Sequence, residues 1–102
     1  MTERDEDKAR PMATGTKQLE TDRAIVWEWR MPPGARTGWH RHGHDYIVVP
    51  LVTGKLGVWT GTQYVESDMT QGVSYSRAVG VEHDVINPNA FEYAFIEIEL
   101  KP

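Results

Sequence analysis

The 102-residue sequence contains no cysteine, which excludes disulfide bonds and thiolate chemistry. It has no run of about 18 apolar residues that would span a bilayer, and its N-terminus has no apolar stretch typical of an export signal. We therefore expect a cytoplasmic protein. Lys and Arg number 11 against 15 Asp and Glu, a formal charge of -4. Because nucleic acids and anionic membranes select basic patches, neither is an expected partner.

Helical periodicity is also missing. No window of useful length has apolar residues at i, i+3, i+4 and i+7, so at most a turn or two of helix is expected. Short extended runs separated by Gly, Pro and Asn predict an all-β sandwich or barrel instead. The main expected strands are AIVWEWR (24–30), DYIVVPLV (45–52), KLGVWT (55–60), QYVES (63–67), GVSYS (72–76), EHDVI (82–86) and FEYAFIEIEL (91–100).

The clearest alternation is in the last run. Apolar residues occupy every even position from 94 to 100, and Glu97 and Glu99 are among the odd positions. This pattern predicts a strand with one face on the core and one face in water. In the first run, Ile25, Trp27 and Trp29 likewise share one face.

The first 18 residues have a different character. Seven of the first ten residues are charged, and Pro11 and small polar residues follow. Such a segment buries too little apolar area to offset its ordering entropy, so we expect residues 1–18 to form a flexible arm whose loss costs the barrel little stability. Residues 19–102 are then one small domain, because a chain of this length has no room for a second core.

Three histidines are the candidate metal ligands. His40 and His42 stand one residue apart, and successive side chains of a strand point to opposite faces, so these two imidazoles lie on the same face within reach of one ion. His83 lies about forty residues downstream. An isolated H-x-H pair is more often two partly exposed histidines without metal. The third histidine and the surrounding glycines favour a metal site here.

The two stretches resemble the paired motifs of the cupin superfamily, G-x5-H-x-H-x(3,4)-E-x6-G and G-x5-P-x-G-x2-H-x3-N. The matching positions are Gly34, His40, His42 and Gly54 in the first motif, and Gly72, Gly80, His83 and Asn87 in the second. The resemblance covers roughly residues 17 to 101. The chain is also similar to very small bacterial cupins that read HDYVVVP after the histidine pair, some of them named for beta-alanine degradation.

The resemblance implies a single-domain jelly-roll β-barrel. It also implies a divalent transition metal, such as Zn, Ni, Fe or Mn, held by His40, His42 and His83. Two positions depart from the motifs. Where cupins usually carry a glutamate ligand this chain has Tyr46, or Ile47 with the longer spacing, and where they carry proline it has Ala78.

Tyr46 and Arg77 are the candidate catalytic residues. Tyr46 either coordinates the metal or lines the pocket and hydrogen-bonds a ligand, since a phenol with a pKa near 10 is a poorer ligand than a carboxylate. Arg77 either meets an anionic substrate or is a solvated charge. His44 is expected outside the ligand set, and Asp45 either supports a histidine or stabilises a turn.

Two functions are consistent with these residues. The first is a metalloenzyme of the dioxygenase, isomerase or hydrolase type that acts on a small polar metabolite in the barrel. The second is a non-catalytic module that binds a metal or small ligand. We also expect a homodimer, paired through the strand near Ile25 to Trp29 or the segment before it, because a barrel this small hides few large apolar side chains.

Overall fold

The computed structural model describes residues 2–102, which form nine strands and one short 3-10 helix. The elements are η1 (Asp5–Asp7), β1 (Thr14–Glu20), β2 (Ala24–Met31), β3 (His40–Arg41), β4 (Asp45–Pro50), β5 (Gly54–Trp59), β6 (Tyr64–Met69), β7 (Tyr75–Arg77), β8 (Glu82–Ile86) and β9 (Tyr93–Leu100). Across residues 2–102, no helix has the length and hydropathy to cross a membrane.

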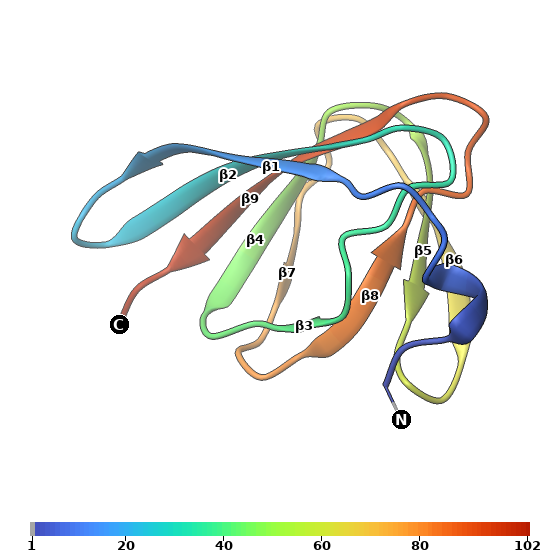
Figure 1. Cartoon of the computed structure of the whole chain (residues 1–102). Coiled ribbons are helices and arrows are strands. Elements are labelled where there is room, and N and C mark those ends of the chain that lie inside the picture. The colour runs from blue at the N-terminus through green and yellow to red at the C-terminus, as the bar shows by residue number, and fades with distance from the viewer. Residues whose placement is uncertain (1) are drawn as a thin grey trace.

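The strands form two antiparallel sheets that face each other (Figure 1). The larger sheet has the order β1-β2-β9-β4-β7, and the smaller one has the order β3-β8-β5-β6. Neighbours in these sheets are distant in sequence, as when β9 lies between β2 and β4. The predicted all-β jelly-roll barrel is therefore confirmed.

The core lies between the two sheets. Inward side chains alternate with outward ones along each strand, so each sheet contributes every second residue to it. The cluster of buried residues consists of Met31, Ala35, Tyr46, Val48, Leu56, Val85, Tyr93 and Phe95.

The last strand faces in a direction that its pattern does not predict. In β9, Phe95, Glu97 and Glu99 face the barrel interior, where they line a cavity. The even positions therefore face outward, and Ile96 and Ile98 are only partly buried. The expectation that the apolar even face meets the core is wrong, because the odd positions face the cavity between the two sheets.

The strand near Ile25 to Trp29 has no free edge. It belongs to β2, which pairs with β1 along one side and with β9 along the other. The edge of this sheet is β1, the segment before it, which extends with β2 away from the barrel (Figure 1). The expectation that a partner subunit pairs along β2 is therefore wrong. The edge strand with which a partner could pair is β1.

The N-terminal segment also differs from the expected arm. Residues 14–18 belong to β1, and the carboxylate of Asp7 in η1 is fully buried. The guanidinium groups of Arg4 and Arg10 donate hydrogen bonds to that carboxylate at 2.7 and 2.8 Å. Arg36 of the barrel donates to Glu3 at 2.9 Å. The charges that suggested a solvated arm are satisfied by ion pairs, which composition alone does not reveal.

Two motif residues explain the turn chemistry around β8. Gly80 precedes this strand with φ of 93°, a left-handed conformation that glycine adopts at low cost. Asn87 follows the strand and is fully buried, and its side-chain amide donates to the carbonyls of Met31, Pro32 and Phe91. Both residues stabilise the loops that hold β8, and neither lines the cavity.

Candidate metal centre and cavity

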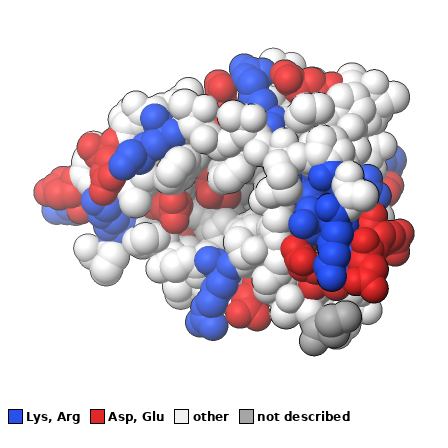
Figure 2. Space-filling view, in the orientation of Figure 1, with Lys and Arg blue, Asp and Glu red and all other residues white. Residues whose placement is uncertain are grey.

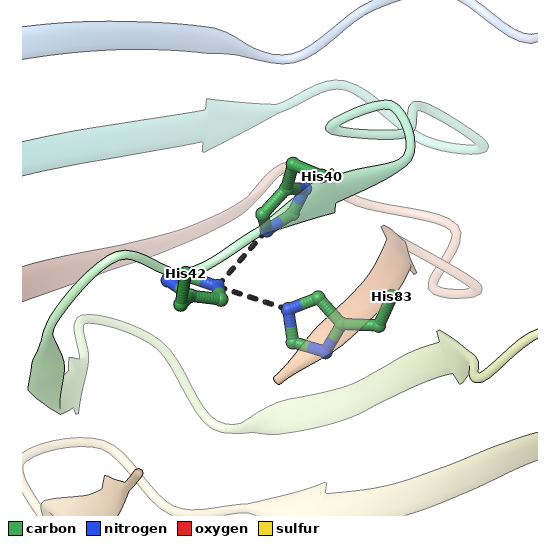
Figure 3. A group of neighbouring side chains, drawn as sticks. All are labelled: His40, His42 and His83. Atoms are coloured by element: carbon green, nitrogen blue, oxygen red, sulfur yellow. Dashed lines mark hydrogen bonds between the residues drawn. The ribbon is translucent and has the colours of Figure 1, made fainter. Parts of the chain in front are cut away.

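Strand pairing brings the three histidines together. His40 of β3 and His83 of β8 are direct partners across the antiparallel ladder, so their side chains share a face. His42 lies two residues after His40 and returns to the same face, and its backbone N–H bonds to Val81 at 2.9 Å. Figure 3 shows the three rings pointing toward one another from these two segments. The predicted trio therefore exists as one cluster.

The ring nitrogens of the trio converge. Nε2 of His42 lies 3.0 Å from Nε2 of His40 and 3.1 Å from Nε2 of His83. Nδ1 of His40 lies 2.7 Å from the carbonyl oxygen of Gly38. That carbonyl can only accept, so the Nδ1 of His40 carries the proton and its Nε2 keeps a free lone pair. This second contact is the kind that fixes the tautomer of a metal-ligating imidazole.

The environment keeps two of the rings neutral. His42 and His83 are only 6 % and 9 % exposed. Burial, followed by the charge of His40, lowers the pKa of His42 to about 4. Burial and the two neighbouring histidines lower the pKa of His83 to about 3. Neutral imidazole is the ligating form, so His42 and His83 are ready to ligate at neutral pH.

Tyr46 packs flat on the ring of His42. The two ring centroids are 3.8 Å apart and the planes make an angle of 17°. The hydroxyl group of Tyr46 is buried and has no hydrogen-bond partner in the described protein. Burial, together with the charge of Glu97, raises the pKa of the phenol well above its usual range. The side chain therefore holds His42 in place and leaves a neutral hydroxyl group free for a ligand.

A cavity of about 560 Å³ extends from the trio between the two sheets. Its wall is mostly apolar and aromatic, with contributions from Trp27, Trp29, Tyr46, Tyr75 and Phe95. A recess is visible near the middle of the face in Figure 2, with acidic atoms at its edge. An enclosed, mainly apolar space with a few polar groups is typical of a small-molecule site.

Arg77 lies on the cavity wall near the three histidines. It is the cross-strand partner of Tyr46, and its guanidinium group lies 4.7 Å from the ring centroid of Tyr75. The same group donates to the backbone carbonyl of Ser76 at 2.8 Å. Arg77 is exposed toward the opening, so it is placed to meet an incoming anion.

His44 and Asp45 lie outside the ligand cluster. Nδ1 of His44 is 3.2 Å from a carboxylate oxygen of Glu99, and the other oxygen of Glu99 accepts the indole N–H of Trp27 at 2.6 Å. Asp45 accepts a hydrogen bond from the backbone N–H of Val79 at 2.8 Å. Asp45 is thus a turn residue, and His44 holds Glu99 rather than the metal cluster.

Glu97 is the cavity residue that sequence reasoning missed. It faces the interior from the middle of β9, opposite Trp27 of β2. Burial raises the pKa of its carboxyl group to about 7, and the nearby charge of Glu99 adds to the shift. The indole of Trp29 opposes the shift slightly, although its N–H group makes no hydrogen bond of regular geometry. The signal available in the sequence was that Glu97 lies two residues after Phe95 and so shares its face of the strand.

Solved structures place this architecture in a known family. A cupin domain from Bordetella pertussis Tohama I is 54 % identical, with a TM-score of 0.89 over 91 % of this chain and 97 % of that one. An RmlC-like cupin from Methanocaldococcus jannaschii has a TM-score of 0.72 at 13 % identity, over 91 % and 84 % of the two chains. The chain belongs to the cupin superfamily, as its two motifs predict.

A curated relative gives a more particular comparison. The Beta-alanine degradation protein BauB of Pseudomonas aeruginosa is 49 % identical over 92 residues, which cover 90 % of this chain and 97 % of that protein. No protein-family model matches the sequence. The likeness extends over nearly the whole of both chains, so this chain and the Pseudomonas protein share one domain of the same size.

Proposed function

We propose that this cupin is a metal-dependent enzyme that binds one divalent transition-metal ion on His40, His42 and His83 and acts on a small polar metabolite in the barrel cavity. The observation that carries the proposal is the convergence of three Nε2 atoms in a partly buried cluster. Three neutral donors on one face leave other coordination positions free for water or substrate.

The geometry of the cluster fits such an ion. The nitrogen atoms are 3.0 and 3.1 Å apart in two of the pairs, and the three lie within 4.8 Å of one another, so one ion could be held by all three. Imidazole suits Fe, Mn, Ni and Zn, and any of these would find its ligands here. The bond from His40 to Gly38 gives independent support, because it turns a lone pair toward the centre.

The ion would supply Lewis acidity toward a carbonyl or carboxylate oxygen, the chemistry shared by the dioxygenase, isomerase and hydrolase types. Tyr46 would then orient the ring of His42 and offer its free hydroxyl group to the bound molecule. Arg77 would attract an anionic group at the opening. The name of the Pseudomonas relative directs the first search to beta-alanine and related acids.

A second candidate is a binding or sensing module without turnover. The observation that favours it is Tyr46, which replaces the motif carboxylate with a phenol that burial keeps neutral. The two candidates differ in one measurement, namely product formation by metal-loaded protein.

Metal analysis of the protein as isolated is the first test, followed by assay of the loaded protein against beta-alanine-pathway intermediates, keto acids and sugar acids. We expect close to one ion per chain and turnover of one compound class. Tyr46→Phe should keep the metal and lose turnover. Binding without turnover across all three sets would support the sensing module. Absence of metal from the isolated protein and after reloading would refute the metalloenzyme and leave only a module that binds a small ligand.

A further inference from the structure

We propose that the cavity recognises a short amino carboxylate, with Glu97 holding the cationic amine and the histidine end of the cavity, together with Arg77, holding the carboxylate. This inference rests on the proposed function for its carboxylate end. The amine end rests on Glu97 and its neighbours alone.

Among residues 2–102, no cationic group forms an ion pair with the carboxyl group of Glu97. Glu97 lines the cavity, and no cation is among the groups that shift its pKa. Its neighbour Glu99 differs, because both of its oxygens are engaged, one by Trp27 and one by His44. A half-buried carboxylate without a cationic partner is costly, and a ligand cation removes that cost. Glu97 is therefore the acidic group of this wall that is free to accept a ligand.

The surroundings of Glu97 suit an ammonium group. The strand register places Trp27, Glu97, Val48 and Tyr75 in one row across β2, β9, β4 and β7. The two aromatic residues thus lie on either side of Glu97 on the inner face of the sheet. Aromatic faces attract cations and gain strength when water is excluded. The free hydroxyl oxygen of Tyr46, in the adjacent row, is a further acceptor.

The next row has a positive charge, Arg77, at one end. It contains Glu99, Tyr46 and Arg77, and Tyr46 stacks on the metal-ligand candidate His42. A molecule that reaches from this row to Glu97 therefore meets a cationic end and an anionic end within one cavity. Because Glu97 and Tyr46 are diagonal neighbours on paired strands, the span is short, and a compact chain with one amine and one carboxylate matches it.

Calorimetric titration tests this assignment. Metal-loaded protein is titrated with glycine, 3-aminopropanoate and 4-aminobutanoate, and with propanoate and propylamine, which each keep one charged end. We expect one of the amino carboxylates to bind at least about 10-fold more tightly than propanoate, the range of a charge-assisted hydrogen bond. Equal affinity for propanoate and all three amino carboxylates would overturn the inference, and this comparison needs no variant.

Glu97→Gln is the matching variant, and Glu28→Gln is its control. Glu28 lies on the outer face of the same sheet, opposite Ile96, so its replacement makes the same charge change away from the cavity. Glu97→Gln should weaken the amino carboxylate by about 10- to 100-fold and leave propanoate within about 2-fold, whereas Glu28→Gln should change neither. Equal losses in both variants would overturn the inference.

Metal content, measured on the same samples, separates the two proposals. If the protein holds no metal and propylamine still binds in a manner that depends on Glu97, the proposed function fails and the amine site stands. If metal is held and propanoate binds as tightly as every amino acid tested, the amine site fails and the proposed function stands.

Discussion

Glu97 should contribute a fall in the free energy of unfolding as the pH rises from about 4.5 to about 7. In the unfolded chain this carboxyl group ionises near 4.5, whereas in the folded protein burial raises its pKa to about 7. Between these values the native state holds a proton that the unfolded state has released. Unfolding therefore releases protons, and raising the pH favours it. The full stabilisation is present below pH 4.5 and is lost as the pH passes 7.

A pKa difference of about 2.5, at about 1.4 kcal/mol for each pKa step, sets an upper value of about 3 kcal/mol for this effect. Glu97 is partly exposed, so solvent screening reduces the value to about 1 to 3 kcal/mol. His42 and His83 act in the opposite direction: their lowered pKa values make the unfolded state bind more protons below pH 6.5. A wild-type profile alone therefore mixes both effects.

The difference between Glu97→Gln and wild type isolates the carboxyl group, since both proteins keep the histidines. Urea unfolding of metal-free protein at pH 5 and pH 8 gives the four free energies required. Relative to wild type, the variant should be more stable at pH 8 than at pH 5 by about 1 to 3 kcal/mol, and Glu28→Gln should show no such change. If the free energies of unfolding of variant and wild type differ by the same amount at pH 5 and pH 8, the raised pKa assigned to Glu97 is wrong.

Three further perturbations test other parts of the structure. His83→Ala should remove most of the metal that wild type retains after dialysis against a weak chelator, and His44→Ala should retain nearly all of it; retention by His83→Ala would refute the trio. Asp7→Ala should lower the free energy of unfolding by about 2 to 4 kcal/mol, because two arginines lose their carboxylate. A loss below about 1 kcal/mol would show that the N-terminal segment adds little stability, as expected of a flexible arm. Light scattering should give about twice the 11.6 kDa of one chain, and Leu19→Lys in the exposed edge strand β1 should reduce it; a wild-type mass of one chain would refute the homodimer.

The histidine cluster was predictable because its information is local. The period of two puts His40 and His42 on one face whatever the rest of the chain does. His83 came from the spacing of its motif, and its pairing with His40 confirms that spacing. The bond from His40 to the carbonyl of Gly38 was not predictable, because it depends on the path of the loop before β3.

The glutamates of β9 show that an alternating pattern does not reveal which face of a strand points inward. A period of two separates two faces without stating which face is inside, and hydrophobicity usually decides. Here Glu97 and Glu99 point inward because β9 lies in the middle of its sheet, where the inner face borders a cavity and not a packed core. The charged N-terminus has contacts that its composition does not predict. Composition counts charges, but Asp7 is buried because Arg4 and Arg10 are close enough to pair with it.

Tyr46 and Glu99 together suggest why a carboxylate is dispensable at position 46. The two residues are direct cross-strand partners, so the negative charge lies one strand away from the place where the motif puts it. The histidine cluster is then a set of neutral donors, and a bound divalent ion would keep its full charge. The same cavity is lined by two carboxyl groups, Glu97 and Glu99, so the charge of such an ion and its counter-charges would come from different parts of one wall. The proposed amino carboxylate, with a negative and a positive end, would complement that arrangement.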